Sequence, residues 1–160
     1  MRRGQAALEF LTTYGWAFLV ILIMIGALAY FGILSPGRFL PERCNIGPEF
    51  TCDEYQVTNS DGTLRIKFTN NVGETIDSVT VTKCWWAQEE LNTSTGGITV
   101  VGGSGPYKAG DAVEINCAFD NTLFPPVGAK MKFGADITYI PQGKTYTKPL
   151  TAEVYTTLQP

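Results

Sequence analysis

The sequence predicts an α+β protein in which a long apolar amino-terminal helix is followed by an all-β antiparallel sandwich head. Two observations support this fold class. No charged residue occurs from Phe10 to Gly37, a stretch of 28 residues. Beyond it, apolar and polar residues alternate in short segments separated by turn residues, which is typical of strands with one buried face. We expect the helix to end at residue 37 and the head to occupy residues 38–160.

The apolar stretch is long enough to cross a membrane as one helix. About 20 residues, rising about 1.5 Å each, span a hydrocarbon core about 30 Å thick. No polar face recurs at helical spacing, which argues against a surface helix. Arg2 and Arg3 precede the stretch and a mildly acidic body follows it, so the amino terminus is expected in the cytoplasm and the body outside. Ser35-Pro36-Gly37 is expected to end the helix.

The composition excludes several kinds of site. The net charge of the 160 residues is −3, without the basic patch that a nucleic-acid surface needs. Histidine is absent, which removes the commonest general base and metal ligand. No serine, cysteine or carboxylate cluster has a recognisable base partner, so an enzyme is not expected. We also expect no metal and no cofactor.

The four cysteines, Cys44, Cys52, Cys84 and Cys117, form no CxxC pair, which argues against zinc. An even number in a small β-rich body favours two disulfides and an oxidising, extracytoplasmic compartment. Three pairings are possible. We favour Cys44 with Cys52, which enclose a short loop, and Cys84 with Cys117, which lies on the apolar face of its segment.

Glu9 stands at the start of the apolar stretch, where an unpaired carboxylate is costly. The run Arg2-Arg3-Gly4 followed by Gln5-Ala6-Ala7-Leu8-Glu9 resembles the class III signal peptide of archaeal type IV pilins. The resemblance covers about the first 35 residues. It implies that residues 1–4 are a leader and that a prepilin peptidase cuts on the cytoplasmic side, between Gly4 and Gln5.

After that cut, Glu9 would be the fifth residue, where pilins of this family carry a glutamate. Archaellins generally lack it, so the resemblance favours an adhesive pilin. Cleavage would remove Arg2 and Arg3 and create an ammonium group at Gln5, one helical turn from Glu9. In a bundle of identical helices, this cation would offset the desolvation cost of the carboxylate. The alternative is that Glu9 simply lies among lipid headgroups.

The body contains seven or eight expected strands, which point to an antiparallel sandwich. Clusters of Gly, Pro, Asn and Asp separate them. The expected strands are Glu54–Thr58, Thr63–Asn70, Ile76–Cys84, Ile98–Val101, Asp111–Asp120, Ala129–Ile140, Thr145–Lys148 and Thr151–Thr157.

Two further motifs lie in the body. Trp85-Trp86 is interpreted as one ring in the core and one covering a sheet edge, with an exposed binding platform as the alternative. Asn92-Thr93-Ser94 is a glycosylation sequon in a polar loop, and we expect Asn92 to be modified.

These features predict a structural pilin subunit that polymerises through its helix into an extracellular filament. Its expected partners are copies of itself, the prepilin peptidase, the membrane before assembly, and a surface or glycan target. The alternative is a single-pass anchored surface protein whose sandwich binds a glycan or a protein. Both place the head at the cell surface.

Overall fold

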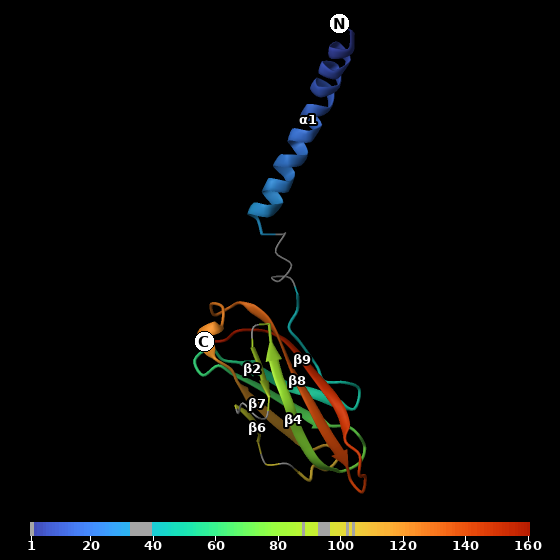
Figure 1. Ribbon diagram of the computed structural model, residues 1–160, viewed down its shortest axis with the longest axis vertical. Coiled ribbons are helices and arrows are strands. Elements are labelled where there is room, and N and C mark those ends of the chain that lie inside the picture. Colours follow the sequence, from blue (N-terminus) through green and yellow to red (C-terminus); the bar gives the residue numbers. More distant parts are fainter. Residues whose placement is uncertain (1, 33–39, 88, 93–96, 102, 104) are drawn as a thin grey trace. The chain divides into compact units, whose positions relative to one another are not determined.

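The computed structural model describes residues 2–32, 40–87, 89–92, 97–101, 103 and 105–160, with the backbone alone for residues 2–7, 11, 89, 91 and 92. The chain divides into two compact units, Met1–Leu40 and Pro41–Pro160. The first contains a single helix and the second a β-rich head (Figure 1). This is the predicted fold class.

The first unit contains helix α1, Arg2–Tyr30. It ends before the expected boundary at residue 37, because Gly32 adopts a positive φ of 70°. The Gly32 N–H donates to the carbonyl oxygen of Ala29 at 3.1 Å. A glycine in this left-handed conformation is a common helix terminator. The expected stop at residues 35–37 lies outside the described part of the chain.

The described part of the head contains nine strands and a short 3-10 helix. They are β1 (Arg43–Asn45), β2 (Phe50–Val57), β3 (Thr63–Asn70), β4 (Ile76–Trp86), β5 (Glu89–Asn92), β6 (Ile98–Val101), β7 (Ala112–Ala118), η2 (Asn121–Leu123), β8 (Lys130–Pro141) and β9 (Lys148–Thr157).

Strands β3 and β6 have the predicted bounds, and the ends of β7 and β8 differ from the predicted ends by one or two residues. The prediction of a separate strand at Thr145–Lys148 was wrong. Lys148 begins β9, and the residues before it form the β8–β9 turn, in which Gly143 has a φ of 71°. Strands β1 and β5, which have 3 and 4 residues, were not predicted from the sequence.

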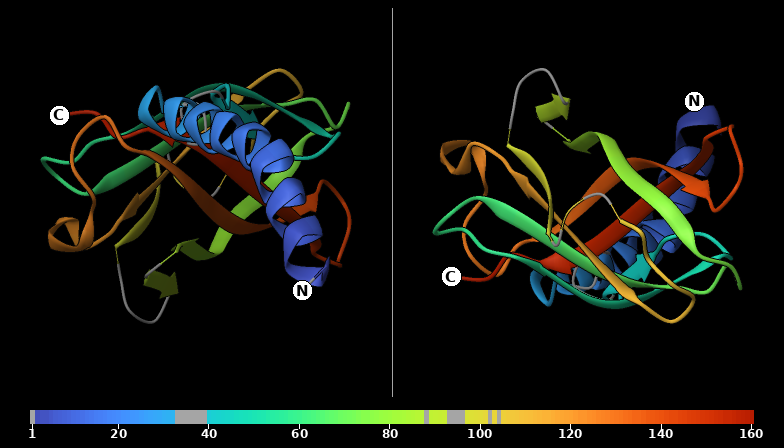
Figure 2. Two further views of the ribbon diagram at one scale, coloured as in Figure 1. Left: turned by 90° about the horizontal axis from the view of Figure 1, so that it is seen from above. Right: turned by 90° about the horizontal axis from the view of Figure 1, so that it is seen from below.

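The strands form two antiparallel sheets, one five-stranded in the order β1-β9-β8-β4-β5 and one four-stranded in the order β2-β3-β7-β6. Figure 2 shows the two layers from both ends. The carboxyl-terminal segment ties them together, because the Gln159 N–H donates to the carbonyl oxygen of Val57 at 2.9 Å. The residues that follow β9 are thereby held against β2 of the other sheet.

The core lies between the sheets and is built from the inward-facing residues of the alternating strands. In β3, Leu64, Ile66 and Phe68 are all 0% exposed. Aromatic rings fill much of the space, with Phe133 packed against Trp86, Phe119 and Phe124. Because burial of apolar surface is the main stabilising contribution to folding, the head has the core of an independent domain.

Candidate anchoring and assembly site

Helix α1 carries the strongest functional signal in the chain. Leu8–Tyr30, a segment of 23 residues with a mean hydropathy of 2.0 in its most apolar part, is long and apolar enough to cross a membrane. Most of its large apolar side chains that the structure describes are exposed, with Trp16 at 74% and Phe18 at 63%. A helix whose whole circumference is apolar requires a lipid environment or other helices around it.

Glu9 is exposed on this helix. It forms no ion pair among the side chains that the structure describes. The backbone is helical from Arg2 through residue 9, so Gln5 and Glu9 are one turn apart on one face. The Gln5 side chain lies outside the described set, as do those of Arg2 and Arg3. Cleavage between Gly4 and Gln5 therefore stays a prediction.

The hydroxyl groups beside Glu9 are satisfied within the helix. Thr13 Oγ1 donates to the Glu9 carbonyl oxygen at 2.8 Å, and Thr12 Oγ1 lies 3.0 Å from the carbonyl oxygens of Leu8 and Glu9. Such bonds to the preceding turn spare a hydroxyl from needing a partner in an apolar medium. The carboxylate of Glu9 is therefore the group in this turn that still needs one.

The two disulfides hold the sheets of the head together. Cys44 in β1 is bonded to Cys52 in β2, with Cα atoms 6.1 Å apart. Cys84 in β4 is bonded to Cys117 in β7, with Cα atoms 6.2 Å apart, and both are fully buried. This is the pairing that the sequence analysis favoured. Each bond joins one sheet to the other, at an edge in the first case and through the core in the second.

The two tryptophans of β4 point to opposite faces of their sheet. Trp86 is 6% exposed and lies in the core, as expected. Trp85 does not cover a sheet edge, because β4 is an interior strand between β8 and β5. Its ring lies over Gly134 on the outer face, where a Cβ atom would overlap it, and the Lys132 Nζ is 5.5 Å from its centroid. A glycine paired with an aromatic ring across strands is a known stabilising arrangement.

The outer face of the four-stranded sheet is polar. Glu54, Lys67 and Glu114 lie side by side on β2, β3 and β7 and line an open hollow of about 410 Å³. Within the described chain, no group of three or more His, Cys, Asp or Glu side chains is arranged to hold a metal ion.

The sequon lies at the end of an edge strand. Asn92 is the last residue of β5, so its backbone is extended and paired with Lys83 of β4. Its side chain, Thr93 and Ser94 lie outside the described set. Glycosylation of Asn92 therefore stays a prediction.

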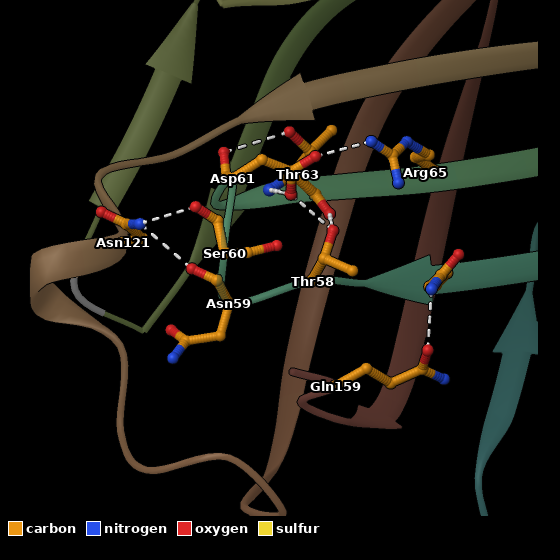
Figure 3. A network of polar contacts seen from close by, with 9 residues as sticks. Thr58, Asn59, Ser60, Asp61, Thr63, Arg65, Asn121 and Gln159 are labelled. Carbon is orange, nitrogen blue, oxygen red and sulfur yellow. Dashed lines mark hydrogen bonds and ion pairs between the residues drawn. The ribbon is translucent and has the colours of Figure 1, made fainter.

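The β2–β3 turn is held by a polar network around Asp61 (Figure 3). The carboxylate accepts hydrogen bonds from the Thr58 hydroxyl at 2.5 Å, the Thr63 N–H at 3.2 Å and the Arg65 Nη2 at 2.6 Å. These donors, the Thr58 hydroxyl foremost, lower the pKa of Asp61. Asn121 donates to the backbone carbonyls of the same turn, which joins it to the β7–β8 loop. The network therefore stabilises loops and contains no acid–base pair suited to catalysis.

The chain enters the head beside β9. The Glu42 Oε1 accepts a hydrogen bond from the Thr157 N–H at 3.1 Å, and the Thr157 hydroxyl also donates to it. That hydroxyl is the first cause of the lowered pKa of Glu42. The entry point therefore lies at the same end of the sandwich as the β7–β8 loop, since Leu158 exchanges backbone hydrogen bonds with Gly128 and Ala129.

Comparison with protein-family models finds no match for this sequence. Comparison with curated proteins likewise finds no matching sequence.

Proposed function

We propose that the protein is a non-enzymatic structural subunit of a type IV-like, adhesive surface filament, made as a membrane-inserted precursor and polymerised through α1. The observation that carries the proposal is a carboxylate, Glu9, near the start of an exposed, mainly apolar helical segment of 23 residues that is joined to a disulfide-linked sandwich. The resemblance of the first residues to class III signal peptides gives the family.

The apolar circumference of α1 supports this role. As a precursor the helix is solvated by lipid, and in a filament the same surface packs against copies of itself. Polymerisation then needs no second apolar surface on the head. The head contributes a folded outer domain whose two disulfides suit an extracellular location.

Glu9 supports the role because it is specific to assembly. An anchor that only spans the bilayer gains nothing from a carboxylate at the start of its apolar segment. After cleavage before Gln5, the new ammonium group lies one turn away and pairs with a carboxylate of its own or of a neighbouring helix. Partners in this proposal are the prepilin peptidase, the membrane and further copies of the chain.

The alternative is a surface protein held by an uncleaved anchor. The continuous helix from Arg2 through residue 9 is compatible with this alternative, which needs no cleavage between Gly4 and Gln5. Trp85 and the polar hollow beside Lys67 would then contribute to a glycan- or protein-binding head.

Mass spectrometry of the membrane-extracted protein separates the two functions. A structural pilin gives a mature chain that begins at Gln5, and surface filaments contain its peptides. An uncleaved anchor retains Arg2 and Arg3. Gly4→Val is the matched variant, because its side chain would crowd the peptidase site; it should accumulate as the full-length form in membranes without filaments. Filaments built from full-length chains would contradict the proposal.

A further inference from the structure

We propose that, while α1 is in the membrane, the β7–β8 loop of the head docks on the lipid surface through Leu123 and Val127. This inference rests on the membrane insertion included in the proposed function, but not on cleavage or polymerisation. The partner that this loop contacts is a bilayer with phosphate headgroups.

The loop presents apolar side chains to solvent at one end of the head. Leu123 is 45% exposed and Val127 is 49% exposed. Between them, Phe124 packs against the core, and the loop ends at Ala129, which is bonded to the carboxyl-terminal segment. Figure 1 shows this loop, in orange, at the end of the head opposite the β8–β9 hairpin. Two exposed branched side chains on one anchored loop form a small apolar tip.

A pocket of about 440 Å³ lies against this loop. Apolar side chains supply most of its wall, and two lysines border it. Its lining includes Trp86, Leu123, Pro125, Lys130, Met131 and Lys132. The indole N–H of Trp86 has no hydrogen-bond partner among the described residues. Trp86 forms the buried floor of this pocket, so the groups that can meet lipid are the exposed aliphatic side chains, beside which lysines can extend their ammonium groups toward the headgroups.

The length of the connecting segment brings this end of the head within reach of the bilayer. Tyr30 and Phe31 close the apolar helix and are 86% and 72% exposed, as in the aromatic belt of a membrane interface. Only residues 33–40 separate Gly32 from Pro41, and a segment of that length extends at most about 30 Å. The chain enters the head at Glu42, beside Thr157 and hence beside the β7–β8 loop.

In the proposed docking, the far end of the head stays away from the lipid. Strand β8 has 12 residues, about 40 Å at about 3.3 Å per residue. The β8–β9 hairpin, with Tyr146 86% exposed, therefore lies far from the lipid when the entry end touches it. Tyr146 is the matched control position.

Charge contributes little to this docking. Lys132 is paired with Glu153 at 2.7 Å, and Glu42, Asp61 and Asp120 bring negative charge to the same end of the head. Because these charges oppose a cationic attraction, insertion of apolar side chains should dominate. The contact is therefore expected to change little with salt.

The experiment uses the full chain reconstituted in vesicles of phosphatidylcholine and phosphatidylglycerol. Val127→Cys and Tyr146→Cys each receive an environment-sensitive fluorophore, labelled without reductant so that the disulfides stay intact. Lipids with spin labels near the headgroup quench only fluorophores at the membrane surface. We expect at least about half of the emission to be lost at position 127 and almost none at position 146. Adding Leu123→Ser to Val127→Cys should reduce the quenching.

Equal quenching at the two positions, or none at position 127, would overturn the inference. Protection of position 127 that grows with the protein-to-lipid ratio, without quenching by lipid, would assign the surface to another copy of the chain and also overturn it. Alkaline carbonate extraction is run in parallel. Release of the chain by carbonate would refute membrane insertion, and with it the proposed function, whereas a retained chain without quenching refutes only the docking.

Discussion

Helix α1 and the head satisfy their apolar residues in opposite ways. In the head, Phe133 is fully buried between two sheets that belong to one chain. In α1, Phe18 is 63% exposed. The head therefore buries its own apolar residues as a folded domain, whereas the apolar surface of the helix still needs lipid or other helices around it. The comparison indicates where function lies: the exposed apolar surface of α1 is the surface that must be covered by another molecule.

The most severe effect is expected from Glu9→Ala, which tests the incomplete part. The substitution makes α1 more apolar, so membrane insertion should persist. Assembly should fail, because the Gln5 ammonium would enter the helix bundle unpaired, at a cost of about 3–5 kcal/mol per subunit. The measurement is filament yield against the amount of processed subunit in membranes. The filament yield of Glu9→Gln should fall between that of the unmodified protein and that of Glu9→Ala. Normal filaments from Glu9→Ala would mean that Glu9 is only a residue of the membrane interface.

A pair of identical substitutions tests the comparison directly. Phe133→Ala should lower the free energy of unfolding of the head by about 3–5 kcal/mol, because it leaves a cavity among Trp86, Phe119 and Phe124. Phe18→Ala should leave that free energy unchanged. Urea titration of the full chain in detergent micelles, followed by near-ultraviolet circular dichroism, measures both. A comparable loss in Phe18→Ala would mean that the head depends on the helix for its stability.

The disulfides sharpen the description of the head as self-sufficient. The two cysteines of the buried bond are 33 residues apart, and those of the edge bond are 8 apart. Because a longer closed loop restricts the unfolded chain more, removing the buried bond should cost about 3–4 kcal/mol and removing the edge bond about 2–3 kcal/mol. The double variants Cys84→Ala/Cys117→Ala and Cys44→Ala/Cys52→Ala, compared in the same urea titration, give the order. The reverse order would show that loop length does not control their contribution.

The smallest effect is expected at the β2–β3 turn. The lowered pKa of Asp61 means that its ionised form stabilises the folded head above the unfolded pKa of about 3.9, and that this contribution is lost as pH falls through the folded value. Asp61 and Arg65 are both exposed, so solvent screening keeps the effect small. In Asp61→Asn, the free energy of unfolding should therefore fall slightly less steeply as the pH is lowered. Thr58→Val removes the foremost donor to Asp61, so the loss of stability in acid should begin at a higher pH. Superimposable profiles would contradict the assignment.

Much of this architecture was predictable because it depends on local pattern. The alternation in residues 63–70 specifies β3 with its buried face, since a shift of one residue would expose Leu64, Ile66 and Phe68. The apolar run specifies α1 in the same way. Glu9 is visible in the sequence because a charge in such a run is rare.

The short edge strands were not predictable. β5 contains Glu89 and Glu90, and β1 contains Arg43, so neither has an apolar face to detect. Each is a strand because a neighbour offers a free backbone edge: β9 pairs with β1, and β4 pairs with β5. The position of Trp85 was not predictable either, because it depends on Gly134, which lies beneath its ring on the neighbouring strand.

The sequence by itself determined the helix, the sandwich class and the carboxylate at the start of the apolar run, because each depends on the polarity of neighbouring residues. Only the tertiary structure decided which sheet each cysteine joins, which end of the head receives the chain, and that Leu123 and Val127 lie at that end. These features depend on contacts between residues far apart in the chain. No local pattern encodes them, since packing of the two sheets brings those residues together.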